Sequence, residues 1–293
     1  MHPYIEIGSR QLPSYGLMMV LGIILSMSVG LLLCRKCYMR FADYFVICVS
    51  SIVCALLGAV LMYVLVTYPI AELWERLIHA RWDNFSAGYV FYGGLLGGVP
   101  GFFLGRKLTG VKLDPAIRTV VTVIPLGHAT GRIGCFLAGC CYGCEYDGPL
   151  AVTYPASNIW SGAGTAPRAP VQLMEAALLL CLFAVLLILF IKRKKGYITL
   201  LTYAGCYSVI RFLLEFMRGD EIRGRAWIFS TAQWVSLVIF TAAAVSVTVL
   251  LLYGRKHPLT TTVPESTLPD DWDDDDDDDD DDASGTGAES TGE

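Results

Sequence analysis

Long apolar stretches, separated by short polar segments, make up most of this 293-residue chain. A helix that crosses a bilayer needs about 20 mostly apolar residues, and seven stretches approach or reach that length. We therefore predict an all-α polytopic membrane protein. Its seven transmembrane helices are expected at roughly residues 15–33, 44–66, 88–104, 116–134, 171–191, 197–217 and 227–253.

Lysine and arginine are spread unevenly over the segments that join these stretches. If the N-terminus lies outside, the inner segments hold thirteen basic residues and the outer segments hold seven. Cytoplasmic loops are enriched in lysine and arginine, so we predict an outer N-terminus and a cytoplasmic C-terminus. Segment 68–87, which contains two tryptophans, then forms a small outer arm, and segment 144–168 forms a small outer head loop. The first stretch lacks a cleavage signature and is expected to remain as a helix.

The C-terminal segment differs from the rest of the chain in composition. Residues 260–293 contain fifteen of the 27 acidic residues and no lysine or arginine, which predicts a disordered tail. We therefore divide the chain into a membrane domain, 1–257, and a cytoplasmic tail, 258–293. Outside the acidic segment, 22 basic residues face 12 acidic ones. This balance suits anionic lipid headgroups. No nucleic-acid partner is expected, because the basic residues are dispersed.

One arginine lies at the end of the fourth apolar stretch, in the glycine- and cysteine-rich segment 131–143. At that depth Arg132 is costly unless it meets a phosphate, a carboxylate or water; alternatively, it extends to the membrane surface. The neighbouring glycines allow a close backbone approach to a ligand. His128 lies four residues earlier, on the same helix face, and is either a general base suited to neutral pH or a packing histidine.

The sixth stretch carries a polar stripe (Tyr207, Arg211, Glu215 and Arg218), whose spacings place its members on one helix face. Either an internal Arg211–Glu215 pair fixes helix packing, or the arginines bind an anion that Glu215 helps to position. Two guanidinium groups, those of Arg132 and Arg211, would make a phosphate clamp. A phospholipid headgroup is the phosphate at that depth.

Four cysteines, Cys135, Cys140, Cys141 and Cys144, crowd into ten residues. A zinc or iron–sulfur site would favour clear CxxC pairs; one such pair is present and no histidine completes it, so we predict no metal and no cofactor. A nucleophilic cysteine would lack an evident base. On an oxidising outer face, we predict at least one disulfide among the four.

Six motifs follow one another in an order that resembles the prolipoprotein diacylglyceryl transferase family over about residues 12–240. They are Ser14-Tyr15-Gly16-Leu17-Met18; Tyr92-Gly93-Gly94-Leu95-Leu96-Gly97; Gly131-Arg132-Ile133-Gly134 with Phe136, Gly139, Tyr142 and Gly143; Arg168-x-Pro170-x-Gln172-Leu173-x-Glu175; Tyr207-x3-Arg211-x3-Glu215-x2-Arg218; and Gln233-Trp234-x-Ser236-Leu237.

The resemblance implies an enzyme of the bacterial cytoplasmic membrane. Such an enzyme moves the diacylglyceryl group of phosphatidylglycerol, a membrane lipid, onto the lipobox cysteine in the signal peptide of a prolipoprotein. A thioether forms and glycerol 1-phosphate leaves. The resemblance also implies that Arg132 and Arg211 hold the phosphate, that Gly143 fixes the loop, and that four further side chains shape the site: Tyr15, Tyr207, Glu215 and Arg218.

Several positions depart from the family pattern. Tyr92 stands where a histidine is usual, and His128 stands where glutamine is frequent. Cys135 and Ala138 replace asparagines, and Cys140 replaces an acidic residue. We hypothesise that His128 or Tyr92 supports deprotonation of the acceptor thiol while the two arginines stabilise the leaving phosphate. The departures also leave an alternative, a diverged paralogue with another acceptor or a non-catalytic phospholipid-binding membrane protein.

Overall fold

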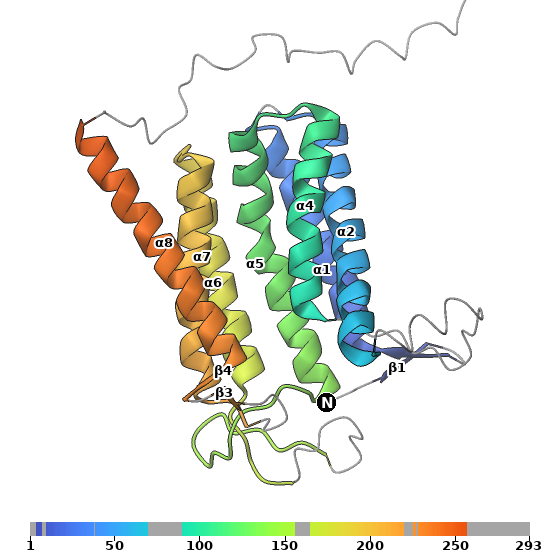
Figure 1. Ribbon diagram of the computed structural model, residues 1–293. Helices are drawn as coiled ribbons and strands as arrows, with labels where there is room; N and C mark the ends of the chain where they lie inside the picture. Colours follow the sequence, from blue (N-terminus) through green and yellow to red (C-terminus); the bar gives the residue numbers. More distant parts are fainter. Residues whose placement is uncertain are drawn as a thin grey trace, which may run out of the picture. The chain divides into compact units, whose positions relative to one another are not determined.

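A computed structural model describes residues 4–7, 10–37, 39–69, 90–155, 165–219, 225–226 and 228–256 (Figure 1). Within these ranges it contains seven α-helices that match the seven predicted stretches in order. They are α1 (Ser14–Cys34), α2 (Phe41–Thr67), α4 (Phe91–Thr109), α5 (Leu113–Ala138), α6 (Val171–Ile191), α7 (Gly196–Glu215) and α8 (Thr231–Lys256).

Two short antiparallel hairpins depart from the all-α prediction. Strand β1 (Tyr4–Ile7) pairs with β2 (Arg10–Pro13) before α1, and β3 (Arg225–Ala226) pairs with β4 (Phe229–Ser230) before α8. Strands of two to four residues are too short for an alternating pattern to be recognised in the sequence. Both hairpins lead directly into a helix.

Six of the described helices are long and apolar enough to cross a membrane: α1, α2, α5, α6, α7 and α8. The protein is therefore a multi-pass membrane protein. Helix α4 falls short of this hydropathy because it contains six glycines and Pro100 and carries Arg106 and Lys107 in its last turn. The structure thus confirms the helical membrane architecture and leaves the seventh span, as well as the orientation, as predictions.

Glycines let α4 pack against α2 at close range. A methyl group on Gly93 or Gly97 would collide with a backbone carbonyl oxygen of α2, at Gly58 and Cys54 respectively. Such close backbone contact is typical of membrane helices that lack bulky interface residues. The glycine-rich second motif therefore forms a helix interface.

Helix α5 lies between two groups of helices and contacts α1, α6 and α7 (Figure 1). In the most apolar 18-residue segment of α5, 50% is buried inside the protein, whereas in the corresponding segment of α8 only 11% is buried. Polar side chains on α5 are therefore shielded from lipid by neighbouring helices. Its last turns, the first turns of α6 and the last turns of α7 lie at the same end of the helices (Figure 1).

Three predicted features lie wholly or partly outside the described residues. They are the acidic tail, 258–293, residues 70–87 of the outer arm, and residues 156–164 of the head loop. The division into a membrane domain and a tail stays a prediction.

Candidate active site

Arg132, on α5, pairs with a glutamate on α6. Its Nη2 lies 3.0 Å from Oε1 of Glu175, whose side chain is only 1% exposed. The carboxylate partly offsets the cost of burying the guanidinium group. Glu175 Oε1 nevertheless makes no hydrogen bond, so the two groups are close but not aligned for one. This contact excludes the alternative in which Arg132 simply extends to the membrane surface.

The polar stripe of α7 forms a second arginine–carboxylate group. Arg211 Nη2 lies 2.7 Å from Glu215 Oε2, and Arg218 Nε lies 3.9 Å from the same oxygen. Ser230, in β4, donates a hydrogen bond of 2.8 Å from its hydroxyl to Glu215 Oε1. The predicted shared face and the Arg211–Glu215 pair are confirmed, and β4 supplies a partner that the sequence did not indicate.

Each of the two central arginines retains a buried nitrogen with no hydrogen-bond partner among the described residues. These atoms are Nε of Arg132 and Nη1 of Arg211. Arg118, elsewhere on α5, also has such a nitrogen, so this feature alone does not define a site. Unlike Arg118, the other two arginines come from different helices and share His128 and Tyr207 as electrostatic neighbours. Buried donors without a partner need an explanation, and an anion would provide one.

His128 and Tyr207 both have Arg132 and Arg211 as electrostatic neighbours. The Tyr207 hydroxyl is 3.5 Å from His128 Nε2, and the ring centroids are 4.9 Å apart. Tyr203 stacks on Tyr207 with parallel rings 5.9 Å apart. An imidazole and a phenol in contact can pass a proton between them, so this arrangement is chemically suited to acid–base catalysis.

The loop that follows α5 is fastened to α6 and α7. Gly143 N–H donates to the Ala169 carbonyl at 3.2 Å, and Cys144 N–H donates to the Met217 carbonyl at 2.8 Å. A methyl group on Gly143 would collide with Ala169. The Arg168 guanidinium donates to the Gly143 carbonyl at 3.3 Å. These contacts agree with the predicted role of Gly143 in fixing the loop.

Gln172 joins the loop to the first turn of α6. Its amide donates to the Cys140 carbonyl at 2.8 Å and hydrogen-bonds with the Tyr154 hydroxyl at 3.0 Å. Burial raises the pKa of Tyr154, so this phenol stays protonated at neutral pH. Gln172 and Glu175 belong to the fourth motif, from which no role was predicted for either residue. A glutamate inside a spanning stretch was the available signal for Glu175.

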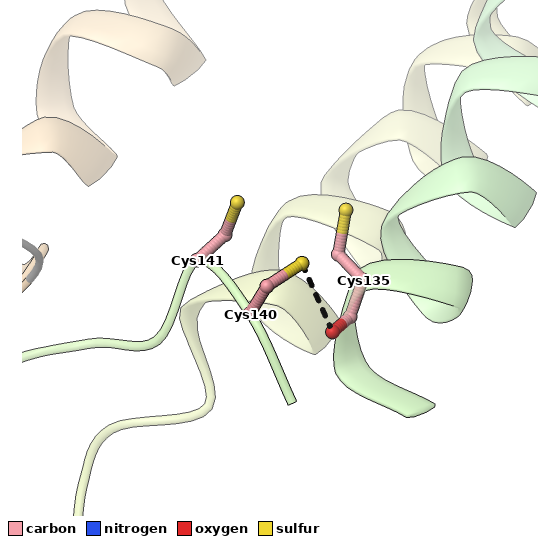
Figure 2. A group of neighbouring side chains, drawn as sticks. All are labelled: Cys135, Cys140 and Cys141. Carbon is pink, nitrogen blue, oxygen red and sulfur yellow. Dashed lines mark hydrogen bonds between the residues drawn. The ribbon is translucent and has the colours of Figure 1, made fainter. Parts of the chain in front are cut away.

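The disulfide prediction is wrong for this structure: none of the four clustered cysteines forms a disulfide. The sulfur atoms of Cys135, Cys140 and Cys141 nevertheless lie within 4.8 Å of one another. Figure 2 shows Cys135 on the helix and the other two on the chain that follows it. Cys144 lies outside this group. The CxxC pair in the sequence, Cys141 and Cys144, therefore did not indicate which cysteines lie together.

The remaining predicted residues lie on two different helices. Tyr15 lies in the first turn of α1, where a methyl group added to Gly134 would be 3.4 Å from it. Its electrostatic neighbours include Arg132 and Cys135. Tyr92, in the first turn of α4, is 38% exposed on a helix that packs mainly against α2. The structure thus brings Tyr15 to the arginine site, whereas the helix of Tyr92 packs elsewhere.

The fold and the site define a multi-pass helical membrane protein with a buried arginine–carboxylate site at one end of its helices. The chain matches the prolipoprotein diacylglyceryl transferase family over residues 3–249, and it belongs to that family. The resemblance inferred from the motifs is confirmed.

Individual relatives match most of the chain. The phosphatidylglycerol–prolipoprotein diacylglyceryl transferase 2 of Clostridium perfringens is 30% identical over 252 residues, which cover 86% of this chain and 96% of the relative. The corresponding transferase of Clostridium tetani is 30% identical over 240 residues, covering 79% and 90%. That of Dehalococcoides mccartyi strain 195 is 29% identical over 252 residues, covering 81% and 89%.

Proposed function

We propose that this protein transfers the diacylglyceryl group of phosphatidylglycerol to the lipobox cysteine thiol of prolipoproteins, releasing glycerol 1-phosphate. The family and the named relatives support this reaction. The observation that carries the proposal for this chain is the pair of buried arginines, Arg132 and Arg211, each with a donor nitrogen that lacks a partner. A lipid phosphate supplies the missing acceptors in the fork geometry that guanidinium groups favour.

The charges of the site suit a phosphodiester. The ion pairs of the site, within the described part of the chain, involve three arginines and two glutamates: Arg132, Arg211, Arg218, Glu175 and Glu215. The net charge of these five side chains is therefore +1. A phosphodiester carries one negative charge, so the bound lipid neutralises the site. Burial strengthens this interaction because water does not screen it.

The reaction is a displacement at carbon. The acceptor thiolate attacks the glyceryl carbon that bears the phosphate, a C–S bond forms, and the C–O bond breaks. The departing phosphate oxygen takes the electron pair, and the two arginines stabilise the charge that develops there. His128, in contact with Tyr207, accepts the thiol proton. Tyr92, the other residue predicted for this role, lies on α4, which packs mainly against α2.

The proposed membrane arrangement has seven spanning helices, α4 included, with an outer N-terminus in the bacterial cytoplasmic membrane. The basic clusters at the inner ends of the helices support it. The site then lies at the outer leaflet, where a phospholipid headgroup and an emerging signal peptide meet.

A transfer assay tests the proposal. Purified protein is placed in vesicles of phosphatidylglycerol or phosphatidylethanolamine with a lipobox peptide that contains cysteine or serine. We expect a gain of one diacylglyceryl mass only with phosphatidylglycerol and cysteine. Folded protein that binds phosphatidylglycerol without transferring it would contradict the proposal. That result would favour the lipid-binding alternative, to which the replaced positions Cys135 and Cys140 point.

A further inference from the structure

Three thiols beside Arg132 have no role in the proposed reaction. Cys135 is in the last turn of α5, and Cys140 and Cys141 follow the helix end (Figure 2). Their three sulfur atoms lie within 4.8 Å of one another, and none forms a disulfide. Cys135 follows Arg132 by three residues, less than one helical turn.

The backbone is shaped to bring these side chains together. Gly139 ends α5 with φ of 74°, and Cys141 has φ of 63°. A non-glycine residue with this left-handed conformation costs on the order of 1 kcal/mol or more, so the surrounding contacts must hold it in place. Those contacts include the hydrogen bonds from Gln172 to the Cys140 carbonyl and from Cys144 to the Met217 carbonyl. The convergence of the three thiols therefore needs no covalent link.

The spacing and the charge fit a single zinc ion. A Zn–S bond of about 2.3 Å places the sulfurs of a tetrahedral site about 3.8 Å apart, which small rotations of side chains already within 4.8 Å can reach. Thiolate ligands favour Zn²⁺ or Cu⁺. Three thiolates and one Zn²⁺ carry a net charge of −1, whereas three thiolates and one Cu⁺ carry −2. Arg132, an electrostatic neighbour of Cys135, offsets one negative charge, so the site is neutral with Zn²⁺.

We propose that Cys135, Cys140 and Cys141 bind one Zn²⁺ as thiolates and leave its fourth position open to the thiol of the acceptor cysteine. Three protein ligands and one open position are the arrangement of catalytic zinc sites. Each cysteine loses its proton to water as the metal binds, whereas a coordinating acceptor thiol gives its proton to His128, the base of the proposed reaction. The zinc site itself is independent of the proposed transferase function, whereas the fourth ligand rests on it.

The zinc site is tested by titrating Co²⁺, a coloured substitute for Zn²⁺, into reduced, metal-free, full-length protein in detergent. We expect one equivalent to bind with a thiolate-to-cobalt charge-transfer band, and Zn²⁺ to displace it. Cys135→Ser, Cys140→Ser and Cys141→Ser should each weaken binding at least about 100-fold, a loss at the upper end of that seen for supporting residues of metal sites.

Cys144→Ser is the matched control, because Cys144 is adjacent in sequence but outside the cluster. It should bind Co²⁺ like the unaltered protein. Absence of the band in protein whose thiols are shown to be reduced would overturn the proposal, as would binding that depends on Cys144 but not on Cys140.

The open position is tested by adding lipobox peptides to the cobalt form. A cysteine peptide should intensify the charge-transfer band, and a serine peptide should leave it unchanged. If one Co²⁺ binds but neither peptide alters the spectrum, the fourth-ligand assignment is wrong. Whether the chain is a transferase is decided separately, by product formation in the vesicle assay.

Discussion

Arginine and glutamate are paired twice at the proposed site, but the two pairs form in different ways. Arg211 and Glu215 lie four residues apart on one helix, so sequence spacing alone predicted that they share a face. Arg132 meets Glu175 across two helices, a contact that no sequence spacing encodes. In the proposed mechanism, both glutamates hold the arginines in place while donor nitrogens remain for the lipid phosphate.

Removal of the Glu175 charge should destabilise the protein. In Glu175→Gln, Arg132 loses the partner of a buried ion pair, which typically costs 3–5 kcal/mol. We expect the melting temperature in detergent to fall by roughly 6 °C or more. Glu145→Gln is the control, because that side chain is 70% exposed and lies 3.5 Å from Arg168; exposed pairs contribute less than about 1 kcal/mol. Equal melting temperatures for the two variants would show that the Arg132–Glu175 pair is not important for stability.

His128→Gln tests the assignment of the proton acceptor. We expect the transfer rate to fall roughly 100-fold, because a positioned general base typically contributes at least that factor. Tyr207→Phe, which removes the hydroxyl 3.5 Å from His128 Nε2, should lower the transfer rate by a smaller factor, because it removes a partner of the imidazole but leaves the imidazole in place. Unchanged turnover in His128→Gln would remove this histidine from the mechanism.

At the scale of elements, the lengths of the apolar stretches predicted the helices well, but the sequence did not predict the short strands or the cysteine cluster. The bounds predicted for α6 agree with the structure, and every predicted stretch contains most of a helix. The strands were missed because β3 and β4 have two residues each. The cysteine cluster was misjudged because it depends on backbone angles at Gly139 and Cys141, which the spacing of cysteines does not reveal.

The packing of α4 on α2 can be tested with two glycine variants. In Gly97→Ala the added methyl group meets the Cys54 carbonyl, and we expect destabilisation of about 1–3 kcal/mol. In Gly205→Ala, on α7, the methyl group has nothing within 4 Å, so stability should change by no more than about 1 kcal/mol. Thermal unfolding in detergent measures both. A tolerated Gly97→Ala would mean that the two helices are not closely packed.

At the scale of the whole molecule, orientation places the site relative to its substrates. Thirteen basic residues in the inner segments against seven in the outer ones predict an outer site. A fluorescent reporter that folds only in the cytoplasm should be active when fused after residue 256. A phosphatase that folds only outside should be inactive at the same position. The reverse result would place the arginines at the inner leaflet and contradict the proposed meeting with signal peptides.

The central claim, that two arginines from two helices hold a lipid phosphate, is tested most directly by Arg211→Lys. The transfer rate from phosphatidylglycerol is compared with that of Arg118→Lys. Arg118 is also buried and donates to the Phe190 carbonyl at 3.1 Å. It lies fourteen residues from Arg132, about 21 Å along α5. We predict that Arg211→Lys loses roughly 100-fold in transfer rate, because an ammonium group cannot replace the guanidinium fork, whereas Arg118→Lys transfers normally. Equal rates for the two folded variants would contradict the phosphate clamp.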